Sequence, residues 1–158
     1  MSTAPWPIEI VRGDAADLRA VNAIMGEAFE PRYGEAWTPS QCLGMLALPG
    51  AWLTLARVDE RVAGFALARA VLDESELLLL ATCPTLRRRG IGGVLLRSVI
   101  ADARIRGATM MHLEVRANND AVALYQGEGF RKIGERRDYY RGNDGKLFDA
   151  HTFSKMLD

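Results

Sequence analysis

The sequence has few cysteines, no long apolar run and no excess of charge, and each absence excludes a class of protein. Cys42 and Cys83 are the only cysteines among 158 residues, too few for a disulfide framework and without the spacing of a zinc site. No apolar run approaches the ~20 residues that a membrane-spanning helix requires. The N-terminal residues lack the basic segment and apolar stretch of a signal peptide. We therefore expect a soluble cytoplasmic protein with no membrane partner and no metal site.

The formal net charge is zero because 20 basic side chains balance 20 acidic ones. A neutral total gives no overall attraction to nucleic acid or to an anionic membrane. The charge is nevertheless divided along the chain, since residues 1–76 carry 6 basic and 11 acidic side chains and residues 77–158 carry 14 and 9. No Asp or Glu occurs between Leu77 and Ala101, a stretch that contains four arginines. That stretch is suited to binding an anion.

The composition and the hydrophobic pattern predict one mixed α/β domain over residues 1–158. Apolar residues make up 49% and charged residues 25%, which are ordinary globular values. Alternating or continuous apolar runs predict strands over residues 8–12, 52–58, 62–72, 77–83, 110–115, 130–135 and 147–153. Helical spacing predicts helices over residues 14–30, 38–48, 92–106 and 118–128. The run at 77–83 is nearly unbroken, which is typical of a strand buried on both faces.

A segment rich in glycine and arginine joins that strand to the next helix. It consists of Arg87, Arg88, Arg89, Gly90, Ile91, Gly92 and Gly93. Helix N-termini expose backbone N–H groups and a partial positive charge, and glycines let a diphosphate approach the main chain closely. A Walker loop needs Gly-Lys-Ser/Thr, and a dinucleotide fingerprint needs Gly or Ala where Leu95 stands, so both are excluded. The residues alone leave open a phosphate site or a turn with solvated arginines.

The pattern Arg87-x-x-Gly90-x-Gly92, between a strand and a helix, resembles the coenzyme A pyrophosphate motif of the GNAT acyltransferases. The resemblance continues in Leu113-Glu114-Val115-Arg116, Asn118-x-x-Ala121-Val122-x-Leu124-Tyr125, Gly129-Phe130, Arg136-Arg137-Asp138-Tyr139-Tyr140 and Asp144-Gly145. The longer set is similar to the RimI subfamily, whose members acetylate protein N-termini, notably that of a ribosomal small-subunit protein. It covers residues 70–158 well and the N-terminal half loosely. The resemblance implies the GNAT fold, a mixed, mostly antiparallel sheet of about six to seven strands flanked by about four helices.

The resemblance further implies acetyl-CoA as cosubstrate, with coenzyme A as product. The main chain of Leu80, Ala81 and Thr82 would hold the pantetheine arm and face the oxyanion if this strand is splayed from its neighbour; a fully paired core strand is the alternative. The segment 87–93 would hold the pyrophosphate. Asn118 would cap the helix that follows and also contact coenzyme A.

Glu114 is the catalytic base that the resemblance implies, acting through water. Alternation within its apolar strand places it on the face of His112, opposite Leu113 and Val115. The residues alone favour a different role, an edge-strand carboxylate paired with Arg116 or another arginine. His112 is a rival base, although packing within the sheet is the simpler role for it.

Tyr125 is the general acid that the resemblance implies, protonating the leaving sulfur, although an aromatic on an apolar helix stripe is usually part of the core.

Two features depart from typical RimI sequences. The stretch from Glu114 to Asn118 is one residue shorter, and Thr82-Cys83 stands where an apolar and a polar or acidic residue are usual. Cys83 has no evident base beside it and is interpreted as a small buried side chain.

The acceptor implied by the resemblance is the N-terminus of a peptide or protein, bound by a monomer or weak dimer. The segment 136–141 would help to shape the acceptor groove; its tyrosines and arginines also suit nucleic acid, which we rank low because the stretch is short. Glu30, Glu35 and the Trp37 segment would form the opposite wall and attract a cationic amine. Two rival functions remain: acetylation of a small amine such as an aminoglycoside or polyamine, and a catalytically silent acyl-CoA-binding module.

Overall fold

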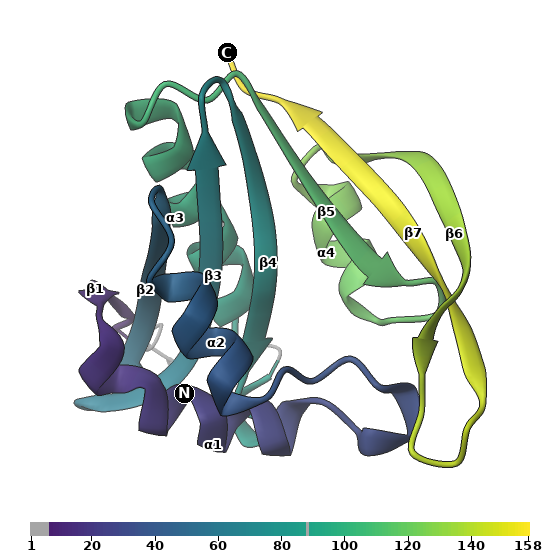
Figure 1. The fold of residues 1–158 in the computed structure, drawn as a ribbon. Coiled ribbons are helices and arrows are strands. Elements are labelled where there is room, and N and C mark those ends of the chain that lie inside the picture. The colour runs from purple at the N-terminus through teal and green to yellow at the C-terminus, as the bar shows by residue number, and fades with distance from the viewer. Residues whose placement is uncertain (1–6, 88) are drawn as a thin grey trace, which may run out of the picture.

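The structure is a computed structural model of the 158-residue chain, and it describes residues 7–87 and 89–158. The described residues form a seven-stranded sheet in the order β1-β2-β3-β4-β5-β7-β6 (Figure 1). The strands are β1 Glu9–Gly13, β2 Ala51–Val58, β3 Arg61–Val71, β4 Glu74–Thr82, β5 Met110–Arg116, β6 Arg131–Arg141 and β7 Leu147–Met156. All neighbours are antiparallel except β4 and β5. The predicted mixed, mostly antiparallel sheet is confirmed.

Two pairs of helices cover opposite faces of this sheet. Helices α1 (Leu18–Ala28) and α2 (Pro39–Leu46) lie in front of it in Figure 1, and α3 (Ile91–Ile105) and α4 (Ala121–Gly127) lie behind it. The front pair packs on Leu53, Phe65 and Leu67. The rear pair packs on a second core that includes Met111, Leu113 and Phe153. Because Met111, Leu113 and Val115 belong to the rear core, Glu114 between them faces forward, as the alternation predicted.

The helix starts follow local signals in the sequence. Thr38 caps α2 in a reciprocal capping box with Gln41, in which Thr38 Oγ1 accepts from the Gln41 N–H and Gln41 Oε1 from the Thr38 N–H. Asp14 forms a similar box with Asp17, but around the short 3-10 turn Ala15–Asp17 that precedes α1. None of the helices in the described part of the chain is both long enough and apolar enough to cross a membrane.

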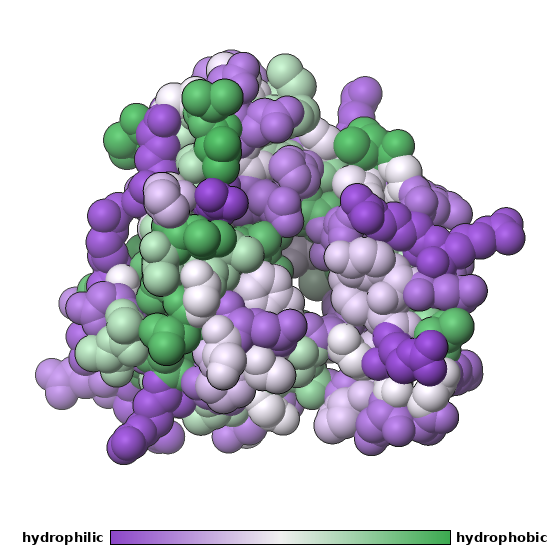
Figure 2. Space-filling view, viewed as in Figure 1, coloured by the Kyte–Doolittle hydropathy of each residue, from purple (hydrophilic) through white to green (hydrophobic). Residues whose placement is uncertain are grey.

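The sheet splits between β4 and β5. Their ladder has three pairs, Glu74 with Met110, Ser75 with Met111 and Glu76 with His112. Beyond them β4 stays paired with β3 as far as Thr82, and β5 stays paired with β7 as far as Arg116. The two strands therefore diverge from a common vertex, as Figure 1 shows, and the space-filling view is hollowed between the halves of the molecule (Figure 2).

Strand β4 carries a bulge that explains its unbroken apolar run. Leu67 pairs with Leu79 and the next residue of β3 pairs with Leu77, so Leu78 is an extra residue and the side chains change face there. Leu77 consequently joins the rear core and Leu79 the front core. The expectation of burial on both faces holds only in part, because Leu78 and Leu80 are half-buried at the split.

Strand β6 is longer than the sequence pattern predicted. It continues through the segment 136–141, which is a strand and not a loop. Arg136 pairs with Ala150 and Tyr140 with Phe148, so three residues of β6 oppose the single Asp149 of β7. The bulged Asp138 has a φ of 53° and donates its N–H to Asp149 Oδ1 at 2.9 Å. The segment has no apolar alternation, so its strand character was not visible in the sequence.

Candidate active site

The open edge of β4 lies on the side that β5 leaves. Leu80, Ala81 and Thr82 pair with β3 on one side, and the β4–β5 ladder has already ended at Glu76. Among the described strands, none pairs with the other edge of this segment. The alternative of a fully paired strand is therefore wrong. An unpaired strand edge offers N–H and C=O groups to an extended ligand, and the amides of a pantetheine arm fit such an edge.

The N-terminus of α3 begins with a left-handed glycine. Gly90 has a φ of 81°, a conformation that glycine adopts without strain, and a Cβ added there would meet nothing within 4 Å. Val94 donates the first helical hydrogen bond to the Gly90 carbonyl, so the amides of Ile91, Gly92 and Gly93 have no partner within the helix. The first turn contains no acidic side chain. These features fit a bound diphosphate.

Gly92 has a different structural role. A Cβ at Gly92 would lie 3.2 Å from Leu124 Cδ2, so this glycine allows α3 to pack closely on α4. The α3 glycines therefore serve two purposes that the sequence motif does not distinguish: a backbone conformation at Gly90 and helix packing at Gly92.

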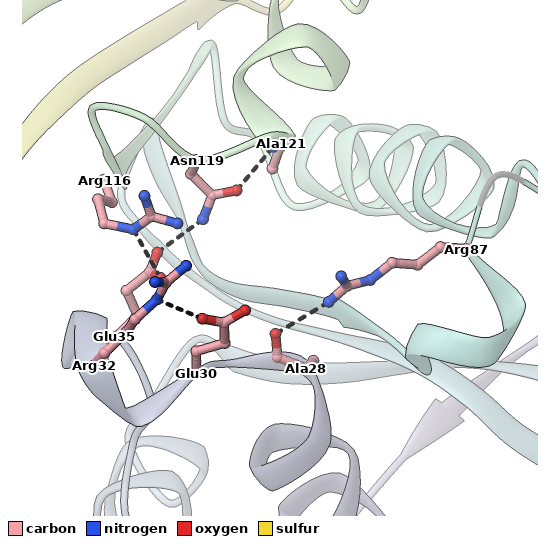
Figure 3. A network of polar contacts seen from close by, with 8 residues as sticks. All are labelled: Ala28, Glu30, Arg32, Glu35, Arg87, Arg116, Asn119 and Ala121. Atoms are coloured by element: carbon pink, nitrogen blue, oxygen red, sulfur yellow. Dashed lines mark hydrogen bonds and ion pairs between the residues drawn. The ribbon is translucent and has the colours of Figure 1, made fainter.

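The arginines before α3 are exposed where the structure describes them. Arg87 Nη2 donates to the Ala28 carbonyl at the end of α1 at 3.0 Å (Figure 3). This bond uses one of the five N–H donors of the guanidinium. Arg89 is also exposed, and the predicted contact of Arg88 lies outside the described residues. A phosphate contact of these arginines stays a prediction.

Glu114 is paired with an arginine of β6. Its Oε1 lies 2.6 Å from Arg136 Nε; the Glu114 side chain is 20% exposed and that of Arg136 is 63% exposed. Tyr139, from the β6 bulge, also donates to Glu114, and burial followed by this bond raises the pKa of the Tyr139 hydroxyl. The expected arginine partner is therefore present, but it is not Arg116, and β5 is not an edge strand.

Tyr125 is buried in the rear core. It is 6% exposed, and its ring makes an edge contact with Phe130 at 6.0 Å between centroids. Burial, and then the charge of Glu35, raises the pKa of Tyr125. The hydroxyl is therefore a protonated donor at neutral pH. The core role and the role of proton donor are compatible at this position.

Tyr140 is a site residue that sequence reasoning singled out only as part of a segment. Burial raises its pKa first, followed by the charge of Glu35 and the effects of Tyr139, Glu114 and Tyr125. The charge of Glu35 thus acts on both phenols, that of Tyr125 and that of Tyr140. Tyr140 resumes the pairing with β7 after the β6 bulge, opposite Phe148, and no residue spacing in the sequence indicates such a bulge.

Asn119, and not Asn118, holds the start of α4. Asn119 Oδ1 accepts from the Ala121 N–H at 2.8 Å, whereas Asn118 is exposed in the preceding turn. The predicted cap is therefore wrong by one residue, because the chain turns for four residues after β5 before the helix begins. Asn118 instead lines a cavity of about 300 Å³ with Arg32, Tyr33, Arg116, Asp144, Lys146 and Phe148.

Glu35 is not available to attract a cationic amine. Its Oε1 accepts from Arg116 Nε at 3.1 Å and its Oε2 from Asn119 Nδ2 at 2.8 Å (Figure 3). Glu30 is paired with Arg32 at the surface. The expected acidic wall is therefore neutralised within the protein. The sequence could not show this, because the partners are 81 and 84 residues from Glu35.

His112 marks the vertex of the split. Its Nε2 lies 3.0 Å from Glu76 Oε2, at the last pair of the β4–β5 ladder. This contact joins the two strands below the point where they separate. In the described part of the chain, no group of three or more His, Cys, Asp or Glu side chains is arranged to hold a metal ion.

Comparisons with known proteins agree with this geometry. Residues 18–130 match the family model described as "Acetyltransferase (GNAT) family". The chain is 45% identical over 83 residues to the [ribosomal protein bS18]-alanine N-acetyltransferase of Salmonella typhimurium, a match that covers 52% of this chain and 56% of that protein. It is 35% identical over 151 residues to the N-alpha-acetyltransferase RimI of Mycobacterium tuberculosis, covering 92% of this chain and 89% of that protein.

The fold is also similar to solved structures. The ribosomal-protein-S18-alanine N-acetyltransferase of Escherichia coli superimposes with a TM-score of 0.85 and 30% identity, covering 96% of this chain and 95% of that one. The sequence match to the curated Salmonella relative spans little more than half of that protein. The family match, by contrast, spans most of the present chain and includes β4, α3, β5 and α4. This chain belongs to the GNAT family of acetyltransferases.

Proposed function

We propose that this protein transfers the acetyl group of acetyl-CoA to the α-amine of a protein N-terminus. The observation that carries the proposal is the split between β4 and β5, which leaves the β4 edge open beside Glu114. The family is defined by acetyl transfer. The relatives in Salmonella typhimurium and Mycobacterium tuberculosis are named for acetylation of an alanine and of an α-amine, which supports the choice of acceptor.

Acetyl-CoA would bind along the open edge and the start of α3. The main chain of Leu80, Ala81 and Thr82 would hold the pantetheine arm, and the amides of residues 91–93 would hold the pyrophosphate. Exposed arginines of the segment 87–93 would add charge-assisted hydrogen bonds. A backbone N–H of the β4 edge would donate to the carbonyl oxygen as it gains negative charge.

Glu114 and Tyr125 would move the protons. An α-amine has a pKa of about 7.7–8.0, so most of it is ammonium at pH 7 and must lose a proton before it attacks. Glu114 would accept that proton through water, and the amine nitrogen would bond to the acetyl carbon. The nitrogen would then lose its second proton to water as the carbon–sulfur bond breaks. Tyr125 would give its proton to the departing thiolate. The phenol is protonated at neutral pH and so holds the proton that this step needs, and its raised pKa makes it a weaker acid than an ordinary tyrosine.

The acceptor would enter from the front of the sheet, opposite α3 and α4. The β6 bulge with Arg136 and Tyr139 would form one wall, and the segment between α1 and α2 would form the other. Arg136 would be displaced from Glu114 when an amine takes its place. Because the Arg136 side chain is exposed, breaking its ion pair with Glu114 costs little free energy.

The test is release of coenzyme A from acetyl-CoA in the presence of N-terminal peptides, free lysine, polyamines and an aminoglycoside. We expect turnover of peptides, with kcat lowered about 100-fold by Glu114→Gln and 10-fold or more by Tyr125→Phe. Both substitutions keep the shape of the side chain, and thermal unfolding checks the fold. Turnover of small amines without turnover of any peptide would contradict the proposed acceptor. Binding of acetyl-CoA without turnover of any amine would identify a binding module instead.

A further inference from the structure

The carboxylate of Glu35 connects three elements that are distant in the sequence. Glu35 lies between α1 and α2, Arg116 ends β5, and Asn119 precedes α4. One oxygen of Glu35 accepts from Arg116 and the other from Asn119 (Figure 3). The Glu35 side chain is 8% exposed and that of Arg116 is 10% exposed. The guanidinium of Arg116 also stacks 3.5 Å above the centroid of the Tyr33 ring, so Arg116 is held on both sides by the α1–α2 segment.

The bond to Asn119 passes on to the helix that carries Tyr125. Asn119 uses its amide nitrogen for Glu35 and its oxygen for the Ala121 N–H. Helix α4 has seven residues, and its N-cap Asp120 makes no side-chain capping bond. A helix this short is not stable by its own hydrogen bonds. The orientation of Asn119, fixed by Glu35, therefore helps to set where α4 begins.

The bond to Arg116 acts on the strand that carries Glu114. Arg116 follows Glu114 by two residues in β5. A buried ion pair adds little net stability, because the loss of hydration offsets the Coulomb attraction. Such a pair is better explained by the geometry that it imposes. Here it holds the end of β5 at the point where the chain turns toward α4.

We propose that Glu35 is a positioning residue for acetyl transfer, which sets the geometry between Glu114 on β5 and Tyr125 on α4 through Arg116 and Asn119. This inference rests on the proposed roles of Glu114 and Tyr125.

Two substitutions test the bridge from its two ends. Asn119→Asp keeps an oxygen for the Ala121 N–H but replaces the donor to Glu35 with a second carboxylate. Glu35→Gln removes the charge that pairs with Arg116. Glu9→Gln is the matched control, because Glu9 lies on β1 at the opposite edge of the sheet and its ion pair with Arg57 is exposed, at 67% and 40%. We expect kcat to fall about 10-fold or more in both test variants, with the KM for acetyl-CoA changed less than about twofold and the control unchanged.

The split between kcat and KM separates positioning from a general loss of structure. Loss of positioning should lower kcat with little change in the KM for acetyl-CoA, whereas damage to the fold would also raise that KM. Wild-type kcat in folded Asn119→Asp and Glu35→Gln would overturn the inference. If Glu35→Gln does not fold, Asn119→Asp decides alone.

Amide hydrogen exchange distinguishes failure of this inference from failure of the proposed function, because it needs no acceptor. Exchange in α4 over residues 121–125 should be faster in Asn119→Asp and Glu35→Gln than in wild type, and unchanged in Glu9→Gln. If wild type acetylates no amine, the proposed function fails, and unaltered exchange in both variants would overturn the bridge independently. Faster exchange would support the bridge whichever amine is the acceptor.

Discussion

At the scale of single residues, the orientation of Glu114 is predictable from the sequence, but its partner is not. Glu114 faces the front of the sheet because its neighbours in β5 are buried behind it. The sequence predicts this orientation from alternation alone. It does not predict the partner, because Arg136 comes from β6 and reaches Glu114 only through the pairing of β5 and β6 with β7. Similarly, two adjacent asparagines are equivalent as sequence signals, and only the turn after β5 selects Asn119 as the residue that binds the helix start.

The ion pair between Arg136 and Glu114 leads to a prediction for the free enzyme. Arg136→Gln should leave stability within about 1 kcal/mol of wild type, because an ion pair with one exposed partner contributes little. It should also preserve or raise kcat/KM at neutral pH, since the amine no longer has to displace a guanidinium from Glu114. Steady-state kinetics with a peptide acceptor and thermal unfolding measure the two effects.

Arg137→Gln is the control for this substitution, because Arg137 is the adjacent exposed arginine of the same bulge. It removes the same charge from the segment without touching Glu114. A loss of 10-fold or more in kcat/KM that is specific to Arg136→Gln would show that Arg136 contributes to catalysis and is not merely displaced.

At the scale of elements, regular pieces were predictable and irregular ones were not. The α2 start at Thr38 and the α3 start at Gly90 agree with their local signals. The extension of β6 was missed because a bulge interrupts its ladder and its exposed residues do not alternate. The bulge at Leu78 was missed for the opposite reason. Every residue around it is hydrophobic, so the change of face leaves no break in the pattern. Bulges depend on the partner strand, which local sequence does not contain.

The two ends of α3 offer a matched pair of glycines. Gly90 and Gly107 both have a positive φ, 81° and 92°, and a Cβ at either meets nothing within 4 Å. Valine at each position should therefore destabilise the fold by a similar ~1–2 kcal/mol through backbone strain. Gly90→Val should in addition weaken acetyl-CoA binding 10-fold or more, because Gly90 precedes the amides assigned to the pyrophosphate. Calorimetric titration with acetyl-CoA checks this, and equal affinities of the two variants would contradict the pyrophosphate placement.

At the scale of the whole molecule, long-range contacts decide what the two halves of the chain do. The motifs of residues 87–125 locate the expected acetyl-CoA face from sequence alone. The N-terminal half contributes Glu35, whose partners lie beyond the β4–β5 split and could not be inferred from composition. The acidic character of residues 1–76 therefore does not translate into an acidic acceptor wall. Glu35, for example, is paired inside the protein with Arg116 of the basic half.

This distribution of charge predicts how ionic strength acts on the two substrates. The exposed Arg87 and Arg89 lie beside an α3 start that lacks acidic residues, so their attraction for a diphosphate is open to screening. Between 0.1 M and 1 M salt the Debye length falls from about 10 Å to about 3 Å. The KM for acetyl-CoA should therefore rise severalfold with salt. S-acetylpantetheine, which has the same reacting group but no pyrophosphate, should show a KM that changes less than about twofold. The KM for a peptide acceptor should also change little, because Glu35 is buried in its bridge with Arg116 and Asn119. A strong salt dependence of the peptide KM would instead place a further accessible carboxylate, besides Glu114, in the acceptor groove.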